Sequence, residues 1–341
     1  MASKVKDELI KMYVECLQQG QLPWTKGMKH LKMARNLQSG RRYTGMNAMI
    51  LAYIAQKRGY KGSRWMTFTQ IDNYRKEHGI TGSFFNVPAK GAGVPVRCWG
   101  MKIYDKEKGE WSSKVYPIPK VKEMIKLGKI EESQLKIVPL SDIYVFNEDI
   151  INGVIPEPER QVDPVEQEEK VQFLIDEMKV GYEERSVPSA YYSPSEDLVV
   201  VPSINEFNDA QYYISTQLHE LSHATGAKHR LNRESLINSD GFGGEIYAKE
   251  ELAVEIAASF ICSAMGVETD EKHDLNHAAY IQSWISLFEN DPKVLDEAIS
   301  TAETIEKYVV DIVDRAPNRS KELDWDISDK NKIERGDEIG R

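Results

Sequence analysis

The sequence predicts an α+β protein of two domains, a mixed α+β domain followed by a mainly helical domain with a small sheet. A chain of 341 residues is long enough for two domains that each bury a core. Residues 151–164 are rich in proline and acid, which is typical of a linker. Charge changes sign across this stretch: residues 1–150 hold 26 Lys+Arg and 14 Asp+Glu, whereas the remainder holds 18 and 40. We therefore expect domains at residues 1–150 and 165–315, and a charged tail at 316–341.

Periodicity and glycine stops predict the elements of the first domain. Helices are expected where apolar residues recur at helical spacing and a glycine follows, at residues 4–19, 47–58 and 67–78. Strands are expected at residues 94–104, 111–116 and 137–146, the first two joined by a turn at Lys108-Gly109.

The second domain is predicted to be mainly helical. Its expected helices are residues 165–180, a helix carrying residues 219–223, a helix from Tyr247 onward, and residues 275–289 and 292–314. Residues 197–202 (Asp-Leu-Val-Val-Val-Pro) follow a Pro-Ser turn and predict one short strand.

The string His219-Glu220-Leu-Ser-His223 is the most informative segment. Residues i and i+4 of a helix lie on one face, so both imidazoles can reach one metal ion. The spacing is that of zinc hydrolases, in which the intervening glutamate serves as general base. Asp209 or Asn208 is expected to cap this helix, and Gly226 to end it in the left-handed conformation. The alternative is a helix with two surface histidines.

A catalytic zinc needs a third protein ligand, for which the sequence offers competing candidates. Glu251 and Glu255 share a face of the next helix, which suits a ligand carboxylate and a carboxylate that orients a ligating histidine. His229 completes the metzincin spacing H-E-x-x-H-x-x-G-x-x-H, although the Met-turn expected downstream is matched only weakly at Met265. His277 is expected beside the site or in a structural role. Glu251 is preferred, with Glu255 and His229 as alternatives.

These residues predict metal-assisted hydrolysis. Zn²⁺ would polarise a carbonyl, and Glu220 would take a proton and pass it to the leaving amine. If the strand at residues 197–202 lay beside the metal, it could pair with an extended peptide, which would make a protein substrate natural.

Positive charge is interleaved with aromatic residues in the first half. A cationic groove with flat rings is the combination that binds single-stranded nucleic acid, so we expect a single-stranded nucleic acid as a partner. The expected contacts are Arg41, Arg42, Tyr43, Lys61, Arg64 and Trp65. The alternative is that most of the aromatic rings are core residues.

The three cysteines, Cys16, Cys98 and Cys262, show neither a disulfide framework nor zinc-knuckle spacing, which fits a reducing cytoplasm. The first residues are charged where a signal peptide would be apolar. No run approaches the ~20 apolar residues of a membrane span. We therefore expect a cytoplasmic protein without membrane contact.

Several motifs resemble those of ArdC-type antirestriction proteins, whose first domain also occurs in some plasmid primases. The N-terminal motifs are Gln21-Leu-Pro-Trp24, Gly40-Arg-Arg-Tyr-Thr-Gly-Met-Asn47, Trp65-Met-Thr-Phe-Thr-Gln70 and Phe146-Asn147. The C-terminal motifs are His219-Glu-Leu-Ser-His-Ala-Thr-Gly226, Arg230-Leu-Asn-Arg233, Glu250-Glu-Leu-Ala-Val-Glu255 and His277-Ala-Ala-Tyr-Ile-Gln-Ser-Trp284. The first set is similar to the family's DNA-binding domain, the second to its zincin-like domain.

The resemblance implies a single-stranded-DNA-binding domain joined to a metallopeptidase-like domain, carried by mobile elements or phages and protecting incoming DNA from restriction. It adds Asn47 to the expected DNA-binding residues and favours Glu251 over His229 as the third ligand. Lys90 departs from the family's pattern because the charge around it is thinner.

Two other functions remain open. In a non-catalytic binding protein the metal would be structural, and Glu220 would be dispensable because a structural site needs no general base. A secreted metzincin protease is disfavoured by the charged N-terminus and by the DNA-binding character of the first half.

Overall fold

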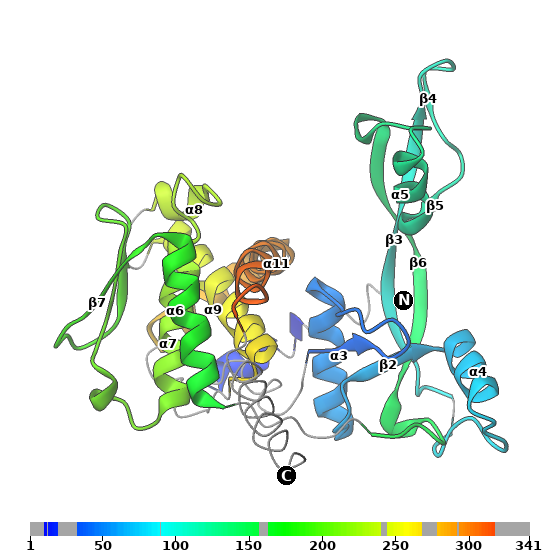
Figure 1. The fold of residues 1–341 in the computed structure, drawn as a ribbon, viewed down its shortest axis with the longest axis horizontal. Coiled ribbons are helices and arrows are strands. Elements are labelled where there is room, and N and C mark those ends of the chain that lie inside the picture. Colours follow the sequence, from blue (N-terminus) through cyan, green and yellow to red (C-terminus); the bar gives the residue numbers. More distant parts are fainter. Residues whose placement is uncertain are drawn as a thin grey trace, which may run out of the picture. The chain divides into compact units, whose positions relative to one another are not determined.

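The computed structural model describes residues 10–11, 13–19, 33–88, 90–156, 163–239, 244–267, 278–291 and 293–317. The chain forms two compact units, residues 1–159 with 274–299, and residues 160–273 with 300–341. The boundary at residue 159 falls inside the expected linker. Residues 274–299 group with the first unit, whereas we expected residues 165–315 to form one domain. Helices and strands are both abundant, and the α+β class predicted from the sequence is confirmed (Figure 1).

The first unit is built on a curled sheet with the order β1-β2-β6-β3-β4, in which β5 also pairs with β3. The strands are β1 (Arg35–Asn36), β2 (Arg64–Thr67), β3 (Val94–Asp105), β4 (Glu110–Trp111), β5 (Tyr116–Pro117) and β6 (Leu135–Asn147). β1 and β2 are parallel and the remaining pairs are antiparallel. The long pair β3 and β6 carries β4, β5 and a helix at one end (Figure 1). The strands expected at 94–104 and 137–146 are confirmed, and 111–116 contains two short strands rather than one.

The helices of this unit are α3 (Gly45–Arg58), α4 (Phe68–Glu77) and α5 (Ile118–Lys126). Two 3-10 turns, η1 (Glu132–Gln134) and η2 (Glu148–Ile150), flank β6. α4 begins with a capping box, since the Thr67 side chain accepts from the Gln70 amide and the Gln70 side chain accepts from the Thr67 amide. α3 ends at Gly59 in the left-handed conformation. The helices expected at 47–58 and 67–78 are therefore confirmed, whereas α5 was not foreseen.

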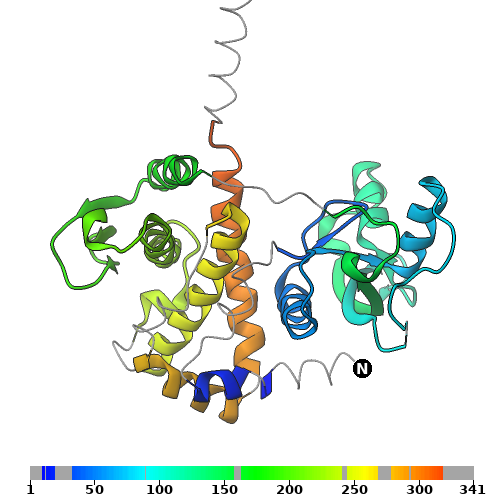
Figure 2. The same cartoon turned by 90° about the horizontal axis from the view of Figure 1, so that it is seen from below.

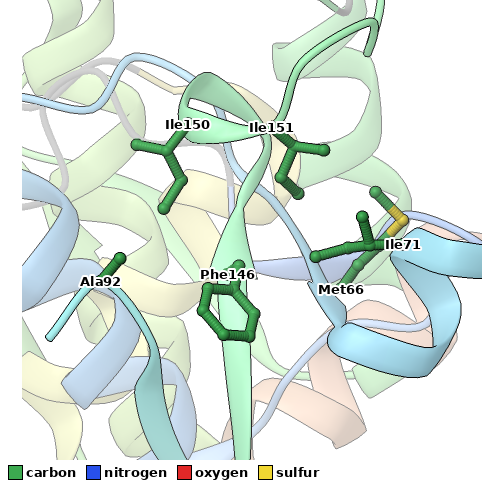
Figure 3. Close-up of a cluster of buried hydrophobic side chains, with 6 residues drawn as sticks. All are labelled: Met66, Ile71, Ala92, Phe146, Ile150 and Ile151. Carbon is green, nitrogen blue, oxygen red and sulfur yellow. The ribbon is translucent and has the colours of Figure 1, made fainter. Parts of the chain in front are cut away.

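α3 and α4 lie on opposite sides of the sheet at β2 (Figures 1 and 2). On the side of α4, six buried residues form an apolar cluster: Met66, Ile71, Ala92, Phe146, Ile150 and Ile151 (Figure 3). Burying a side chain of this size contributes roughly 1.5–3 kcal/mol to folding. The cluster fixes α4 and the segment after β6 against the sheet.

The second unit combines a three-stranded sheet with helices. Its elements are α6 (Pro164–Met178), β7 (Gly181–Glu184), β8 (Tyr191–Ser193), β9 (Leu198–Val201), η3 (Ile204–Glu206), α7 (Ala210–Ala224), α8 (Glu234–Ile237) and α9 (Glu245–Met265). α7 packs against α6, α9, β8 and β9. α10 (Ala278–Asn290) groups with the first unit, and α11 (Lys293–Val313) extends across the boundary between the two groupings.

β9 is the central strand of its sheet, parallel to β7 and antiparallel to β8. Both of its edges are therefore already paired. The expectation that residues 197–202 could accept an extended peptide is wrong, because a strand can be added only at an open edge. Within the described residues, no helix is long and apolar enough to cross a bilayer.

Candidate metal centre

Helix α7 presents the two histidines of the motif. The Asp209 side chain accepts a hydrogen bond from the Tyr212 amide, which confirms the predicted N-cap. The predicted end is wrong: α7 stops at Ala224, Thr225 is right-handed, and Gly226 is absent from the residues with positive φ. Gly226 serves another purpose, because a Cβ there would come within 2.7 Å of the Arg233 guanidinium. The glycine allows a close approach rather than a left-handed turn.

Three donor groups converge on one point. His219, His223 and Glu251 each offer a ligand atom, and these atoms all lie within 4.8 Å of one another. The Nε2 atoms of His219 and His223 lie 3.8 Å and 3.3 Å from the Glu251 carboxylate oxygens. Two imidazoles and one carboxylate form a donor set of catalytic zinc sites, so these residues fit a divalent cation.

The outer nitrogens of both rings face further carboxylates of α9. The Nδ1 atom of His219 lies 3.1 Å from Glu255, and the Nδ1 atom of His223 lies 3.4 Å from Glu250. An imidazole that donates its Nδ1 proton to a carboxylate keeps its Nε2 lone pair for a metal. Both rings are thus oriented with Nε2 toward Glu251. We expected Glu255 in this role, whereas the same role of Glu250 was not foreseen.

Arg233 joins Glu250 to the end of α7. Its guanidinium donates to both carboxylate oxygens of Glu250, at 3.2 and 2.6 Å, and to the Thr225 hydroxyl. It also donates to the backbone carbonyls of Ser222 and His223, at 3.0 and 3.2 Å. These two carbonyls also accept from the Gly226 amide and the Thr225 hydroxyl, so the cation adds to the hydrogen bonds at the end of α7 and complements the helix dipole.

The carboxylates change the protonation of the site. Burial alone would lower the pKa of His219, but nearby acids, chiefly Glu255, outweigh it and raise the pKa to about 9. Burial would likewise lower the pKa of His223, yet Glu251 and Glu250 hold it well above the ordinary value. Burial would raise the pKa of Glu251, but His223 lowers it overall. The site therefore favours positive charge, and a divalent cation would compete with protons for it.

Glu220 is buried next to this group. Burial raises its pKa above that of an ordinary glutamate, and the neighbouring histidines offset only part of that rise. A carboxyl group whose pKa is moved toward neutrality is suited to accept a proton and pass it on.

The other candidate histidines lie elsewhere. The side chain of His229 is 62% exposed and its Nε2 atom pairs with Asp197 at 3.3 Å. His229 is not one of the three grouped donors, so the described residues do not support the metzincin arrangement. His277 lies outside the described residues.

Four of the expected DNA-binding residues are accessible. Arg41, Arg42 and Tyr43 follow a tight turn after β1. The backbone of Arg42 forms an isolated antiparallel β-bridge with that of Arg35 across the turn. The Arg41 side chain and Lys61 are exposed, while Arg42 and Tyr43 are partly buried. Their positions are compatible with a contact to a phosphate backbone.

The other three expected residues are engaged in the fold. Trp65 is 1% exposed and packs edge-on against Tyr60, so no base can stack on it. Arg64 donates to the buried carboxylate of Glu148 and to the Ile155 carbonyl. The Asn47 amide forms two hydrogen bonds with the backbone of Arg97, at 2.8 and 2.9 Å. The burial of Trp65 argues against a stacking role, whereas for Asn47 and Arg64 a contact with DNA in addition to these structural contacts stays a prediction.

Each half of the chain matches a different known protein family. Residues 2–146 match the family model of the N-terminal domain of the anti-restriction factor ArdC, and residues 169–301 match that of zincin-like metallopeptidases. Crystal structures of the antirestriction protein ArdC from plasmid R388 share the fold. The metal-free form has a TM-score of 0.65 and 24% identity, and the Mn(II)-bound form 0.63 and 25%. Both alignments cover 92% of this chain and 99% of the other.

Curated relatives match across most of the chain. Two DNA primases TraC of Escherichia coli are 30% identical over 311 and 309 residues, which is 90% and 89% of this chain. The chain spans only 19% and 27% of the length of these primases. The uncharacterized protein y4eC of Sinorhizobium fredii (strain NBRC 101917 / NGR234) is 28% identical over 84% of both chains. The chain therefore joins a region that matches the N-terminal domain of the anti-restriction factor ArdC to a region that matches zincin-like metallopeptidases, and it has the fold of the ArdC crystal structures.

Proposed function

We propose that this protein protects incoming DNA of a mobile element or phage from restriction, binding single-stranded DNA through its first unit and hydrolysing a peptide bond at the centre formed by α7 and α9. One observation carries the catalytic half: three donors converge, and Glu220 is buried beside them. A site that only stabilised the fold would need no such base.

The donor set favours zinc among divalent cations, with His219, His223 and Glu251 as ligands. The ArdC relative was also crystallised with Mn(II), which supports a divalent cation as the cofactor. A bound ion would supply Lewis acidity toward a carbonyl group and toward water. The protein's own residues do the rest: Glu255 and Glu250 orient the imidazoles, and Glu220 accepts a proton and returns it to the leaving amine.

The DNA-binding half rests on charge and on accessible cations. Residues 1–150 carry a net charge of +12, counted from 26 basic and 14 acidic residues. Arg41, Arg42, Tyr43 and Lys61 are the proposed contacts that the fold leaves accessible. Binding of this kind weakens as salt rises, because phosphates release counterions when cations replace them. The cytoplasm is the proposed site of action, since the number and spacing of the three cysteines indicate no disulfide framework.

The variant Glu220→Gln tests the peptidase. The substitution removes the base with little change of shape, so we expect metal content and affinity for single-stranded DNA to stay at the wild-type level. Protection of transferred DNA should be lost, together with any cleaved host protein that mass spectrometry detects in recipient cells. If Glu220→Gln protects DNA as well as the wild type, the protein is a non-catalytic binder with a structural metal.

A further inference from the structure

One face of the β3–β6 pair exposes large apolar side chains. Successive residues of a strand point to opposite faces, and residues directly opposite each other in a pair share a face. Val94 and Val96 of β3 are buried, so Pro95, Arg97 and Trp99 lie on the other face. Trp99 is 50% exposed there. We call this the Trp99 face.

A register shift adds residues of β6 to the same face. Tyr144 is opposite Pro95, and Ile137 is opposite Met101. Between the pairs that contain Arg97 and Trp99, β6 advances from residue 142 to 139 while β3 advances only two residues. This bulge reverses the alternation of β6, so even-numbered Tyr144 and odd-numbered Ile137 both lie on the Trp99 face. They are 42% and 61% exposed.

Aromatic contacts continue this face toward α4. Phe146 lies two residues beyond Tyr144 and packs against Phe85, with ring centroids 4.8 Å apart. Phe85 in turn lies 6.5 Å from Phe68, the first residue of α4, whose ring is also largely exposed. Exposed rings therefore lie at Trp99, Tyr144 and Phe68. The packed rings of Phe146 and Phe85 lie between Tyr144 and Phe68. Trp99 and Tyr144 are separated by about four residues, or about 13 Å, along the strands.

Cations border this series of rings. Arg97, opposite Asp142 in the register, is exposed on the Trp99 face itself. The turn that carries Arg41 follows Asn36, whose amide donates to Gln70 in the first turn of α4 at 2.9 Å. This hydrogen bond places the basic turn beside the helix end that bears Phe68.

We infer that the Trp99 face is a stacking platform for the unpaired bases of a single-stranded nucleic acid, with Trp99 and Tyr144 as its stacking residues. A polyanion complements the net positive charge of residues 1–150, and only a strand with unpaired bases can offer flat apolar surfaces to the rings. In a duplex the base faces are covered by their neighbours. The inference rests on the proposed DNA binding and specifies its surface.

Fluorescence anisotropy of the full-length protein with labelled oligo(dT) tests this. Trp99→Ala and Tyr144→Ala should each weaken binding about 5- to 150-fold, the range expected for loss of one base–ring stack. Trp99→Phe keeps a ring and should restore most of the affinity. Loss of a neutral ring should leave the salt dependence of binding unchanged, whereas Arg41→Ala should reduce its slope by about one.

Trp111→Ala is the matched control. Trp111 is 39% exposed in the same unit, but it is opposite Tyr104, whose even number puts it on the other face of β3. Its removal should leave affinity within about twofold of wild type. If wild-type protein binds oligo(dT) while Trp99→Ala and Tyr144→Ala bind equally well, the platform is refuted and the face is left to a protein partner. If wild-type protein does not bind oligo(dT), the proposed DNA binding itself fails.

Discussion

Arg233 is predicted to set both the stability of the second unit and its affinity for metal. The Arg233 and Glu250 side chains are almost fully buried, and Arg233 makes five hydrogen bonds, two of them to Glu250. Arg233→Ala leaves the buried Glu250 carboxylate without its guanidinium partner. Breaking a buried pair in this way costs about 3–5 kcal/mol of unfolding free energy.

The effect on metal follows from the contact between Glu250 and His223. Without Arg233, the carboxylate no longer holds the Nδ1 side of His223 in place, and loss of such an outer partner typically costs about 10- to 100-fold in metal affinity. Urea denaturation in the presence of a chelator measures stability. Competition with a chromogenic chelator, at a temperature where every variant is folded, measures affinity for Zn²⁺.

The chain supplies a matched control in Arg230. Its side chain is also buried, and it binds Asp197 with both Nη atoms, at 2.7 and 2.8 Å, and the carbonyls of Ala224 and Met178. Within the part of the chain that the structure describes, the Arg230 side chain donates hydrogen bonds to Met178, Asp197 and Ala224, and the three donors are not among its partners. Arg230→Ala should therefore lower stability without changing the metal affinity of the folded protein. Equal losses of affinity in the two variants, or no loss in Arg233→Ala, would refute a positioning role for Arg233.

Three further outcomes test the packing. Gly226→Ala should destabilise the protein by about 1–3 kcal/mol and weaken metal binding, because its Cβ would collide with the Arg233 guanidinium; unchanged thermal melting would contradict this. Trp65→Ala should cost about 3–5 kcal/mol in urea denaturation, whereas Trp99→Ala should cost under about 1 kcal/mol, and similar losses would contradict the assigned burial. Burial would raise the pKa of Asp197, but Arg230 and Tyr192 lower it overall, so its stabilisation is complete above pH about 3.9 and fades below it. Asp197→Asn, which tolerates the left-handed backbone there, should thus differ from wild type most near neutral pH and least in acid; a constant difference would contradict the ion pair.

The parts of the site that could be predicted are those that depend only on the spacing of residues within one stretch of sequence. His219 and His223 are one helical turn apart, and Asp209 caps the same helix, so one stretch of sequence contains the geometry. The choice between Glu251 and Glu255 could not be made in this way, because both lie on the same face of α9. The structure separates them by the imidazole nitrogen that each one faces, which depends on how α7 packs against α9.

Contacts made by loops folding back were not visible in the sequence. Arg233 is ten residues beyond His223, and no periodic pattern connects the two. Its place is set by the turn after α7 and by the absence of a side chain at Gly226. The glycine was noticed, but its conformation was predicted from the helix-stop pattern, whereas the structure uses it for a close approach. A residue type can thus be foreseen at a position while its physical role is not.

The aromatic residues show that composition alone does not predict which rings are buried and which are exposed. Trp65 and Trp99 lie in equally basic and aromatic surroundings, yet one is in the core and the other on the surface. For Trp99 the signal was present, since Val94 and Val96 alternate with Pro95 and Arg97, and the alternation places Trp99 on the polar side. What the sequence could not reveal is the bulge in β6. Without that extra residue Tyr144 and Ile137 would lie on opposite faces, and Trp99 would share its face with only one of them. The composition of the Trp99 face therefore depends on how β3 and β6 pair, and it can be known only once their register is known.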